Sequence, residues 1–202
     1  MISAIHRCFI AICLMCILTM SIQHPPIHAA PTITGISSSY SMACVVVSGS
    51  VWCFGNNASG RLGNGTKISS KNAVRVIRSD NKPLTQVTAV DTAGSRTCAV
   101  SQGQVWCWGS SFIYAQPDST KAKQIITHTG KPLTNVTQIS LGYGHACALS
   151  RGNVWCWGNN QMGQVGVGRY QQSDAGTHHR FRHPYQRYGH NHWLGAFMCG
   201  SK

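Results

Sequence analysis

The chain has 202 residues, enough for one ordinary domain, and carries 17 lysine and arginine residues against four acids, all of them aspartate. The formal net charge of +13 favours acidic partners, but the basic residues between 31 and 168 are scattered, so we do not favour nucleic-acid binding. Because carboxylates are so few, we expect no enzymatic activity and assign no catalytic, cofactor-binding or metal-ligating residue.

Residues 1–30 have the pattern of a secretory signal peptide. A basic start at His6 and Arg7 precedes an apolar run of thirteen residues at 8–20, and small residues follow at Ala29 and Ala30. A membrane-spanning helix needs about twenty apolar residues, so we expect no stable membrane span; an uncleaved anchor is the alternative. We therefore predict a secreted, periplasmic or cell-surface protein, in which thiols can be oxidised.

One sequence motif occurs three times along the chain. It reads CVVVSGSVWCFG at 44–55, CAVSQGQVWCWG at 98–109 and CALSRGNVWCWG at 147–158. The second cysteines of successive copies are 54 and 49 residues apart, and the segment KPLT at 82–85 returns 49 residues later. A period near fifty with glycine-rich turns is typical of propeller blades of four strands each.

Each copy predicts a β-hairpin in which the two cysteines face each other. The turn pairs suit a two-residue turn with glycine at its second position: Ser48-Gly49, Gln102-Gly103 and Arg151-Gly152. Such a turn places the cysteines on a non-hydrogen-bonded rung, with Cα atoms about 4.5 Å apart. A disulfide tolerates that separation, and a zinc site fits the spacing badly. We predict three disulfides: Cys44–Cys53, Cys98–Cys107 and Cys147–Cys156.

Both faces of the third hairpin are apolar. Alternation places Cys147, Leu149, Val154 and Cys156 on one face and the tryptophans on the other. A strand that is apolar on both faces lies between two layers, so we expect the aromatic pairs to pack between blades. These pairs are Trp52 with Phe54, Trp106 with Trp108 and Trp155 with Trp157. Carbohydrate stacking on a row of exposed tryptophans is the alternative.

The third copy and its flanks resemble the repeat of the regulator of chromosome condensation family, in its bacterial secreted form. The likeness is carried by the pattern GxxHxCAL, with Gly142 and His145, and by GxVWCWGxNxxGQ from Gly152, and it covers about residues 32–168. It implies blades of a seven-bladed propeller that offers loops and faces to partners, and a structural role for His145. The first copy lacks the histidine at Ser41 and the second at Arg96.

The chain departs from its period after Gly168. Residues 169–202 hold four arginines, the unpaired Cys199 and half of the ten histidines. We interpret this tail as disordered sequence, such as a frameshifted end of a gene that once encoded more blades. The alternative is a transition-metal site built from His178, His179, His183, His190 and His192.

The sequence therefore predicts an all-β fold, a partial β-propeller of about three four-stranded blades at about 31–79, 80–130 and 131–168. Three blades cannot close a ring, so exposed faces invite self-association that completes a propeller. The predicted function is a secreted module that binds a protein or a cell-surface polymer, or a truncated remnant of one. The alternative, guanine-nucleotide exchange on a small GTPase, rests on analogy with the family alone.

Overall fold

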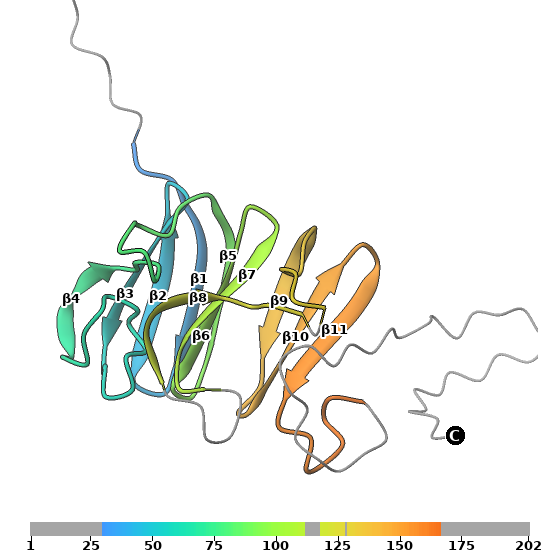
Figure 1. Cartoon of the computed structure of the whole chain (residues 1–202). Coiled ribbons are helices and arrows are strands. Elements are labelled where there is room, and N and C mark those ends of the chain that lie inside the picture. The colour runs from blue at the N-terminus through green and yellow to red at the C-terminus, as the bar shows by residue number, and fades with distance from the viewer. Residues whose placement is uncertain (1–29, 112–117, 128, 167–202) are drawn as a thin grey trace, which may run out of the picture. The chain divides into compact units, whose positions relative to one another are not determined.

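The computed structural model describes residues 30–111, 118–127 and 129–166, which form strands, turns and loops (Figure 1). The predicted signal segment before residue 30 and the histidine-rich tail lie outside the described residues. Eleven strands run through the described part of the chain. They are β1 Ile33–Ser39, β2 Met42–Val47, β3 Ser50–Gly55, β4 Ser70–Arg75, β5 Val87–Ala93, β6 Arg96–Ser101, β7 Gln104–Gly109, β8 Ser119–Gln124, β9 Val136–Leu141, β10 His145–Ser150 and β11 Asn153–Gly158.

The strands form three antiparallel sheets. The first has the order β1-β2-β3-β4, the second β5-β6-β7-β8 and the third β9-β10-β11. Each sheet is a meander, in which every strand pairs with its neighbour along the chain, as in a propeller blade. The all-β partial propeller is confirmed. The third blade has three strands rather than the predicted four within the described residues.

The three hairpins have the predicted turn. Both turn residues have positive φ in every copy, as a type I′ turn requires: 46° and 72° at Ser48-Gly49, 53° and 69° at Gln102-Gly103, and 51° and 72° at Arg151-Gly152. Glycine adopts this conformation without strain. The turn fixes the register, and the cysteines of each hairpin are direct cross-strand partners.

The blades stack face against face. Their first strands, β1, β5 and β9, contact one another in order, and Figure 1 shows the sheets following one another from β1–β4 to β9–β11. The first strand of each following blade is hydrogen-bonded to the preceding hairpin turn. The amide of Val87 in β5 donates to the carbonyl of Gly49, and the amide of Val136 in β9 donates to that of Gly103, both at 2.9 Å. The position of each blade therefore depends on the turn of the blade before it.

Two apolar cores lie between the blades. The cysteine-bearing face of the first sheet packs on the tryptophan-bearing face of the second, in a cluster that includes Cys44, Val46, Ala99 and Trp108. The second and third sheets repeat the arrangement, with Cys98, Val100, Ala146 and Trp157 in one cluster. The prediction of tryptophans between blades is confirmed for Trp108 and Trp157, which are 2% and 3% exposed.

Candidate binding surfaces

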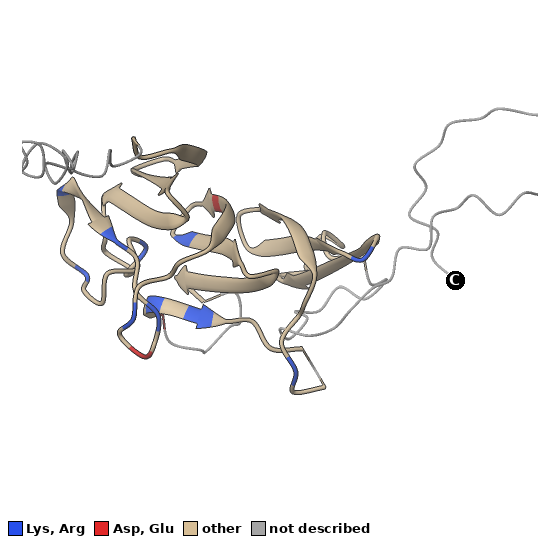
Figure 2. Cartoon of the chain, turned by 90° about the horizontal axis from the view of Figure 1, so that it is seen from above, with Lys and Arg blue, Asp and Glu red and all other residues tan. Residues whose placement is uncertain are grey.

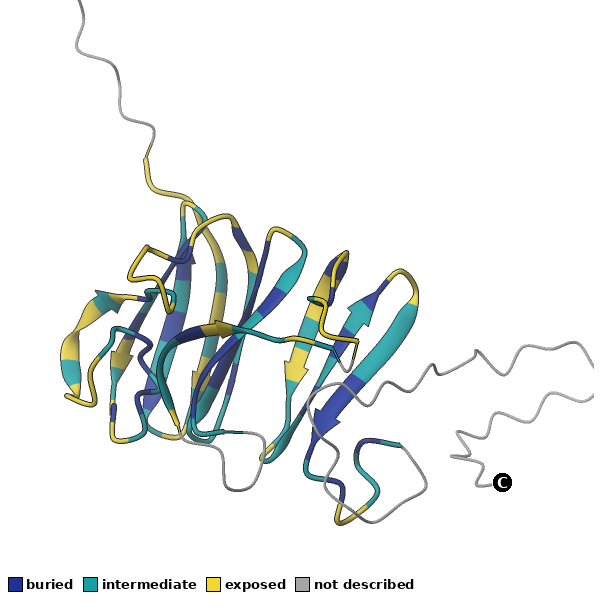
Figure 3. Cartoon of the chain, viewed as in Figure 1, coloured by how far each residue is buried: buried dark blue, intermediate teal, exposed yellow. Residues whose placement is uncertain are grey.

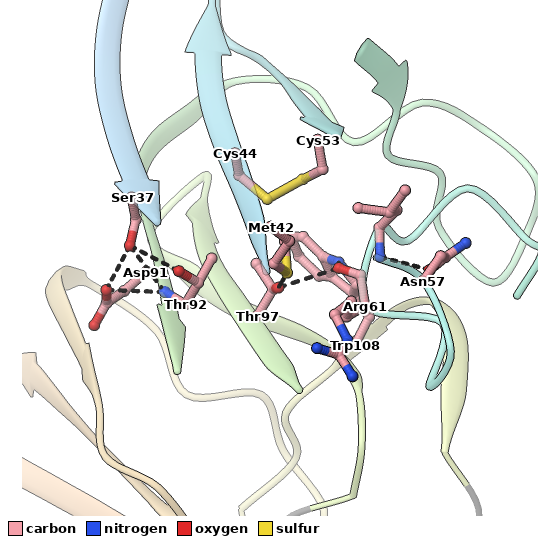
Figure 4. Close-up of a disulfide and its surroundings, with 11 residues drawn as sticks. Ser37, Met42, Cys44, Cys53, Asn57, Arg61, Asp91, Thr92, Thr97 and Trp108 are labelled. Atoms are coloured by element: carbon pink, nitrogen blue, oxygen red, sulfur yellow. Dashed lines mark hydrogen bonds between the residues drawn. A yellow bond between two sulfur atoms is a disulfide. The ribbon is translucent and has the colours of Figure 1, made fainter. Parts of the chain in front are cut away.

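Each predicted cysteine pair is joined in the structure. The S–S distances are 2.09, 2.09 and 2.08 Å, and the Cα atoms are 4.1 Å apart in all three pairs. The separation is slightly below the predicted 4.5 Å, as in a closely paired rung of an antiparallel ladder. Figure 4 shows the bond between Cys44 and Cys53 joining β2 and β3. The disulfides join the two strands of each hairpin: β2 to β3, β6 to β7 and β10 to β11.

A glycine-rich loop of the first blade is built around one buried amide. The Oδ1 atom of Asn57 accepts from the amide of Leu62 at 2.9 Å, and Nδ2 donates to the carbonyls of Thr66 and Ile68, both at 3.0 Å. The third blade repeats the bond, from the amide of Val165 to Oδ1 of Asn160 at 2.9 Å. The two loops therefore have the same backbone arrangement.

This loop of the first blade reaches across to the second blade. The carbonyl of Arg61 accepts from the indole Nε1 of Trp108 at 2.8 Å and from the hydroxyl of Thr97 at 3.2 Å (Figure 4). Gly63 lies so close that a Cβ atom there would be 2.7 Å from Nε1 of Trp108. The indole of Trp108 fills the core between the blades, and its only hydrogen-bond donor, Nε1–H, is paired with the carbonyl of Arg61.

Asp91 connects all three blades near their first strands. Its Oδ1 atom accepts from the hydroxyl of Ser37 and from the amide of Thr92, both at 2.9 Å (Figure 4). Its Oδ2 atom accepts from the amide of Leu141 on β9 at 2.7 Å. No local pattern in the sequence identifies this role of Asp91, because its partners Ser37 and Leu141 lie 54 and 50 residues away.

His145 lies opposite Gly158, at the start of its hairpin. The same register position holds Met42 in the first blade, not Ser41 as predicted from the sequence, and Arg96 in the second. Burial lowers the pKa of His145 below its usual value of 6.5. Burial also lowers the pKa of Arg96, whose guanidinium donates to the carbonyls of Ser111 and Tyr143, both at 2.7 Å. The structural role that the resemblance implies for His145 stays a prediction.

Arginines cover the first tryptophan of two blades. The guanidinium of Arg75 lies 5.8 Å from the ring centre of Trp52, and that of Arg78 lies 5.6 Å from Trp106. Among the described residues there is therefore no row of bare tryptophans of the kind that carbohydrate stacking needs. Thr127 stands where the repeat places Arg78, and Trp155 lines a shallow hollow of about 210 Å³ with Lys131, Arg151 and their neighbours.

Charge is not concentrated on one face. Lys and Arg occur on several strands and loops in the view of Figure 2, and Arg78 pairs with Asp80 at 2.7 Å. Within the described ranges, no three His, Cys, Asp or Glu side chains form a group able to hold a metal ion. In that part of the chain, no helix is long and apolar enough to cross a membrane.

The first blade leaves an apolar face open, which we call the open tryptophan face. Ile36 is 73% exposed and Phe54 38% exposed, and the other members are half-buried; the face consists of Ile36, Ala43, Val45, Trp52 and Phe54. The prediction that Phe54 packs between blades is wrong, since no described residues precede this blade to cover it. Figure 3 shows the mixture of exposed and half-buried residues on the first sheet.

No blade within the described residues packs on the opposite kind of face of the third blade, which we call the open cysteine face. Its members Cys147, Leu149 and Val154 are half-buried. Their counterparts Cys98, Val100 and Val105 in the second blade are fully buried against the next sheet. The stack of blades therefore ends in one face of each kind, and these two faces are the candidate binding surfaces.

The three stacked meanders define the chain as a β-propeller repeat protein. Residues 48–100 and 136–164 each match a family model described as the regulator of chromosome condensation (RCC1) repeat. These residues are therefore repeats of that family, and the resemblance seen in the sequence is confirmed for a small number of repeats. A comparison with curated proteins found no match.

Several solved structures are similar to this chain. The crystal structure of human WBSCR16 has a TM-score of 0.61 at 19% identity, and the match covers 77% of this chain and 41% of that one. The computationally designed Ika4 protein has a TM-score of 0.41 at 12% identity, covering 73% and 74% of the two chains. The first similarity supports the fold, and this chain spans less than half the length of WBSCR16.

Proposed function

We propose that the protein is a secreted binding module whose partner is another protein. The observation that carries this proposal is the open tryptophan face, where Ile36 and Phe54 expose apolar side chains at the end of a rigid stack. Exposed apolar patches of this kind mark interaction sites in soluble proteins. Propellers of repeats generally mediate protein interactions, which agrees with this use of the fold.

The disulfides support export. Each joins cysteines nine residues apart, and closing a loop of that length stabilises a fold by about 2–3 kcal/mol in the chain-entropy treatment. Such bonds persist in oxidising compartments and are reduced in the cytosol. Together with the apolar segment at 8–20, they favour a secreted, periplasmic or cell-surface location.

The proposed role is binding rather than catalysis. Asp91, the one acid within a described strand, has both carboxylate oxygens committed to structural hydrogen bonds. Guanine-nucleotide exchange is not favoured, because a small GTPase would be cytosolic while the cysteine pairs favour an oxidising location. A cell-surface polymer is the other class of partner, and the experiments below separate it from a protein.

Export and oxidation are tested by the intact mass of the full chain produced in a secreting host. We expect a mass reduced by the signal segment and by six hydrogens under non-reducing conditions. Alkylation without reductant should then leave the six hairpin cysteines unmodified. A matched double variant, Cys147→Ala with Cys156→Ala, can form only two of the disulfides. Oxidation should therefore lower its mass by four hydrogens instead of six. A full-length chain with six reactive thiols would contradict the proposal.

Binding is tested by comparing three immobilised baits in the extracellular fraction of the source cells. The wild type and the control Ile68→Asp, changed at a residue outside the open tryptophan face that is 76% exposed, should retain the same protein. Phe54→Asp should lose it. If all three baits retain the same material, the open tryptophan face is not the binding surface. If the material lost is a polysaccharide, the partner class is wrong.

A further inference from the structure

The two interfaces between blades follow one rule. In the first, Cys44, Val46 and Val51 of one blade pack on Ala99 and Trp108 of the next. In the second, the counterparts Cys98, Val100 and Val105 pack on Ala148 and Trp157. A cysteine face therefore receives a tryptophan face in both cases, through side chains at equivalent positions of the repeat.

The open faces at the ends of the stack are the two halves of such an interface. The open cysteine face offers Cys147, Leu149 and Val154, at the positions of residues that are fully buried in both preceding blades. The open tryptophan face offers Trp52 and Phe54 at the positions of Trp106 and Trp108. Each end of the described stack of blades therefore carries the surface that the other end is suited to receive.

From this complementarity we infer that two copies of the chain associate head to tail. The open cysteine face of each copy receives the open tryptophan face of the other. The inference rests on the proposed function and deepens it, since it names a second copy of the chain as the protein that binds these faces. Two such contacts join six blades, within the range of about four to eight in which propellers close. Closure uses up both open faces, so association ends at a dimer instead of continuing into filaments.

The contact between copies differs from the internal ones in one respect. In the internal contact, Nε1 of Trp108 and the hydroxyl of Thr97 donate to the carbonyl of Arg61. The matching loop of the third blade has the same turn bonds, from Gly163 to Asn160 and from Gly166 to Gly163, and it places the carbonyl of Gln164 at that position.

On the open tryptophan face, Phe54 and Ala43 stand where the second blade has Trp108 and Thr97. Neither side chain can donate a hydrogen bond, so the contact between copies consists of apolar packing. The association is therefore weaker than the contacts between blades within one chain, and the dimer dissociates on dilution.

The mass of the exported protein in solution tests this inference, measured by sedimentation velocity over a range of concentrations. We expect the mass of a dimer at high concentration and of a monomer on dilution. Phe54→Asp and Leu149→Asp should each be monomeric, and the control Ile68→Asp should dimerise as the wild type does. Unchanged disulfide content and circular dichroism identify the variants that have folded.

Mixing the two monomeric variants separates head-to-tail association from other arrangements. Phe54→Asp keeps an intact open cysteine face and Leu149→Asp an intact open tryptophan face. The mixture should therefore form a dimer of one copy of each through one of the two contacts, more weakly than the wild type. Dimers formed by either variant alone would show that like faces pair, and would overturn the inference. A wild type that is monomeric at every concentration would overturn it too, since the faces then have another occupant, such as the residues after Gly166.

Phe54→Trp provides a test that does not depend on a damaging substitution. The new indole N–H should reach the carbonyl of Gln164 in the other copy, and one added hydrogen bond at each of the two contacts should tighten the dimer about 10- to 100-fold. An unchanged or weaker dimer would contradict the inferred geometry. A monomeric protein that still loses its partner through Phe54→Asp would overturn this inference and leave the proposed function intact.

Discussion

The second blade is covered on both faces, whereas the first and third are each covered on one. All residues of β6 except Arg96 are buried, while in β10 buried and half-buried residues alternate (Figure 3). The hairpin motif has nearly the same sequence in the second and third blades, so the difference in burial between β6 and β10 comes from the neighbouring blades. In a repeat protein the stability of a unit includes the interfaces that it makes with its neighbours.

The largest expected effect separates a buried aromatic from its open counterpart. Trp108→Ala should lower the free energy of unfolding by about 3–5 kcal/mol, because it leaves a cavity between two blades and removes the hydrogen bond to Arg61. Phe54→Ala should cost about 1 kcal/mol or less, since the ring is partly in water. Urea unfolding at a concentration where the chain is monomeric measures both. Equal losses would show that the end faces are as well packed as the middle.

A second prediction concerns the carboxylate that holds the three blades together. Asp91→Asn should destabilise the protein by about 1–3 kcal/mol. In either orientation the side-chain NH2 group would meet a backbone amide, that of Leu141 or that of Thr92, and two donors cannot pair. Hydrogen exchange at Leu141 or at Thr92 should become faster. Ser140→Ala, at the position in the third blade that corresponds to Asp91, is the matched control and should change stability little. Unchanged protection of both Leu141 and Thr92 in the Asp91 variant would contradict the assigned role.

A smaller effect should follow from exchanging the residues at one repeat position, Arg78 beside Trp106 of the second blade and Thr127 before Trp155 of the third. Arg78→Ala should cost about 0.5–1 kcal/mol, through loss of the cation–π contact with Trp106. Thr127→Arg should fill the hollow beside Trp155 and raise stability by a similar or smaller amount. Thermal unfolding of the two single variants and of the double variant measures the exchange. A gain from Arg78→Ala would show that the hollow, and not the covered ring, is the better arrangement.

The smallest predicted effect is on the pH dependence of stability. Burial favours neutral His145, so its pKa is lower in the folded protein than in the unfolded chain. The unfolded chain therefore binds more protons as the pH falls through about 6.5, and stability decreases from that pH downwards until the lowered pKa is passed. His145→Met, which copies Met42 of the first blade, should remove this part of the decrease. Identical pH profiles would show that other groups cause it.

The sequence predicted the hairpins and their contacts well, because these features depend on residues close together in the chain. Turn pairs such as Ser48-Gly49 dictate the two-residue turn, and the turn dictates which cysteines face each other. Alternation along the strands then indicates that both faces are buried, and Trp108 and Trp157 lie where this pattern places them.

Features that depend on distant segments were not predicted. The role of Asp91 requires β1, β5 and β9 to lie side by side, and alternation within one strand carries no information about that contact. The outer strands β4 and β8 have polar sequences that are typical of loops. Their residues alone do not predict a strand, and they form one by pairing with β3 and β7. The exposure of Phe54 depends on whether a neighbouring blade is present, which its own repeat does not encode.

The hydrogen bond between the first strand of a blade and the preceding turn also bears on how such a chain can gain or lose repeats. The amide of Val136 donates to the carbonyl of Gly103 as that of Val87 does to Gly49, so each unit brings its own attachment to the unit before it. A duplicated segment of about 49 residues would add a blade whose two faces already match those of its neighbours. Tandem duplication or loss of a unit can therefore change the length of this protein in whole blades without new packing having to arise.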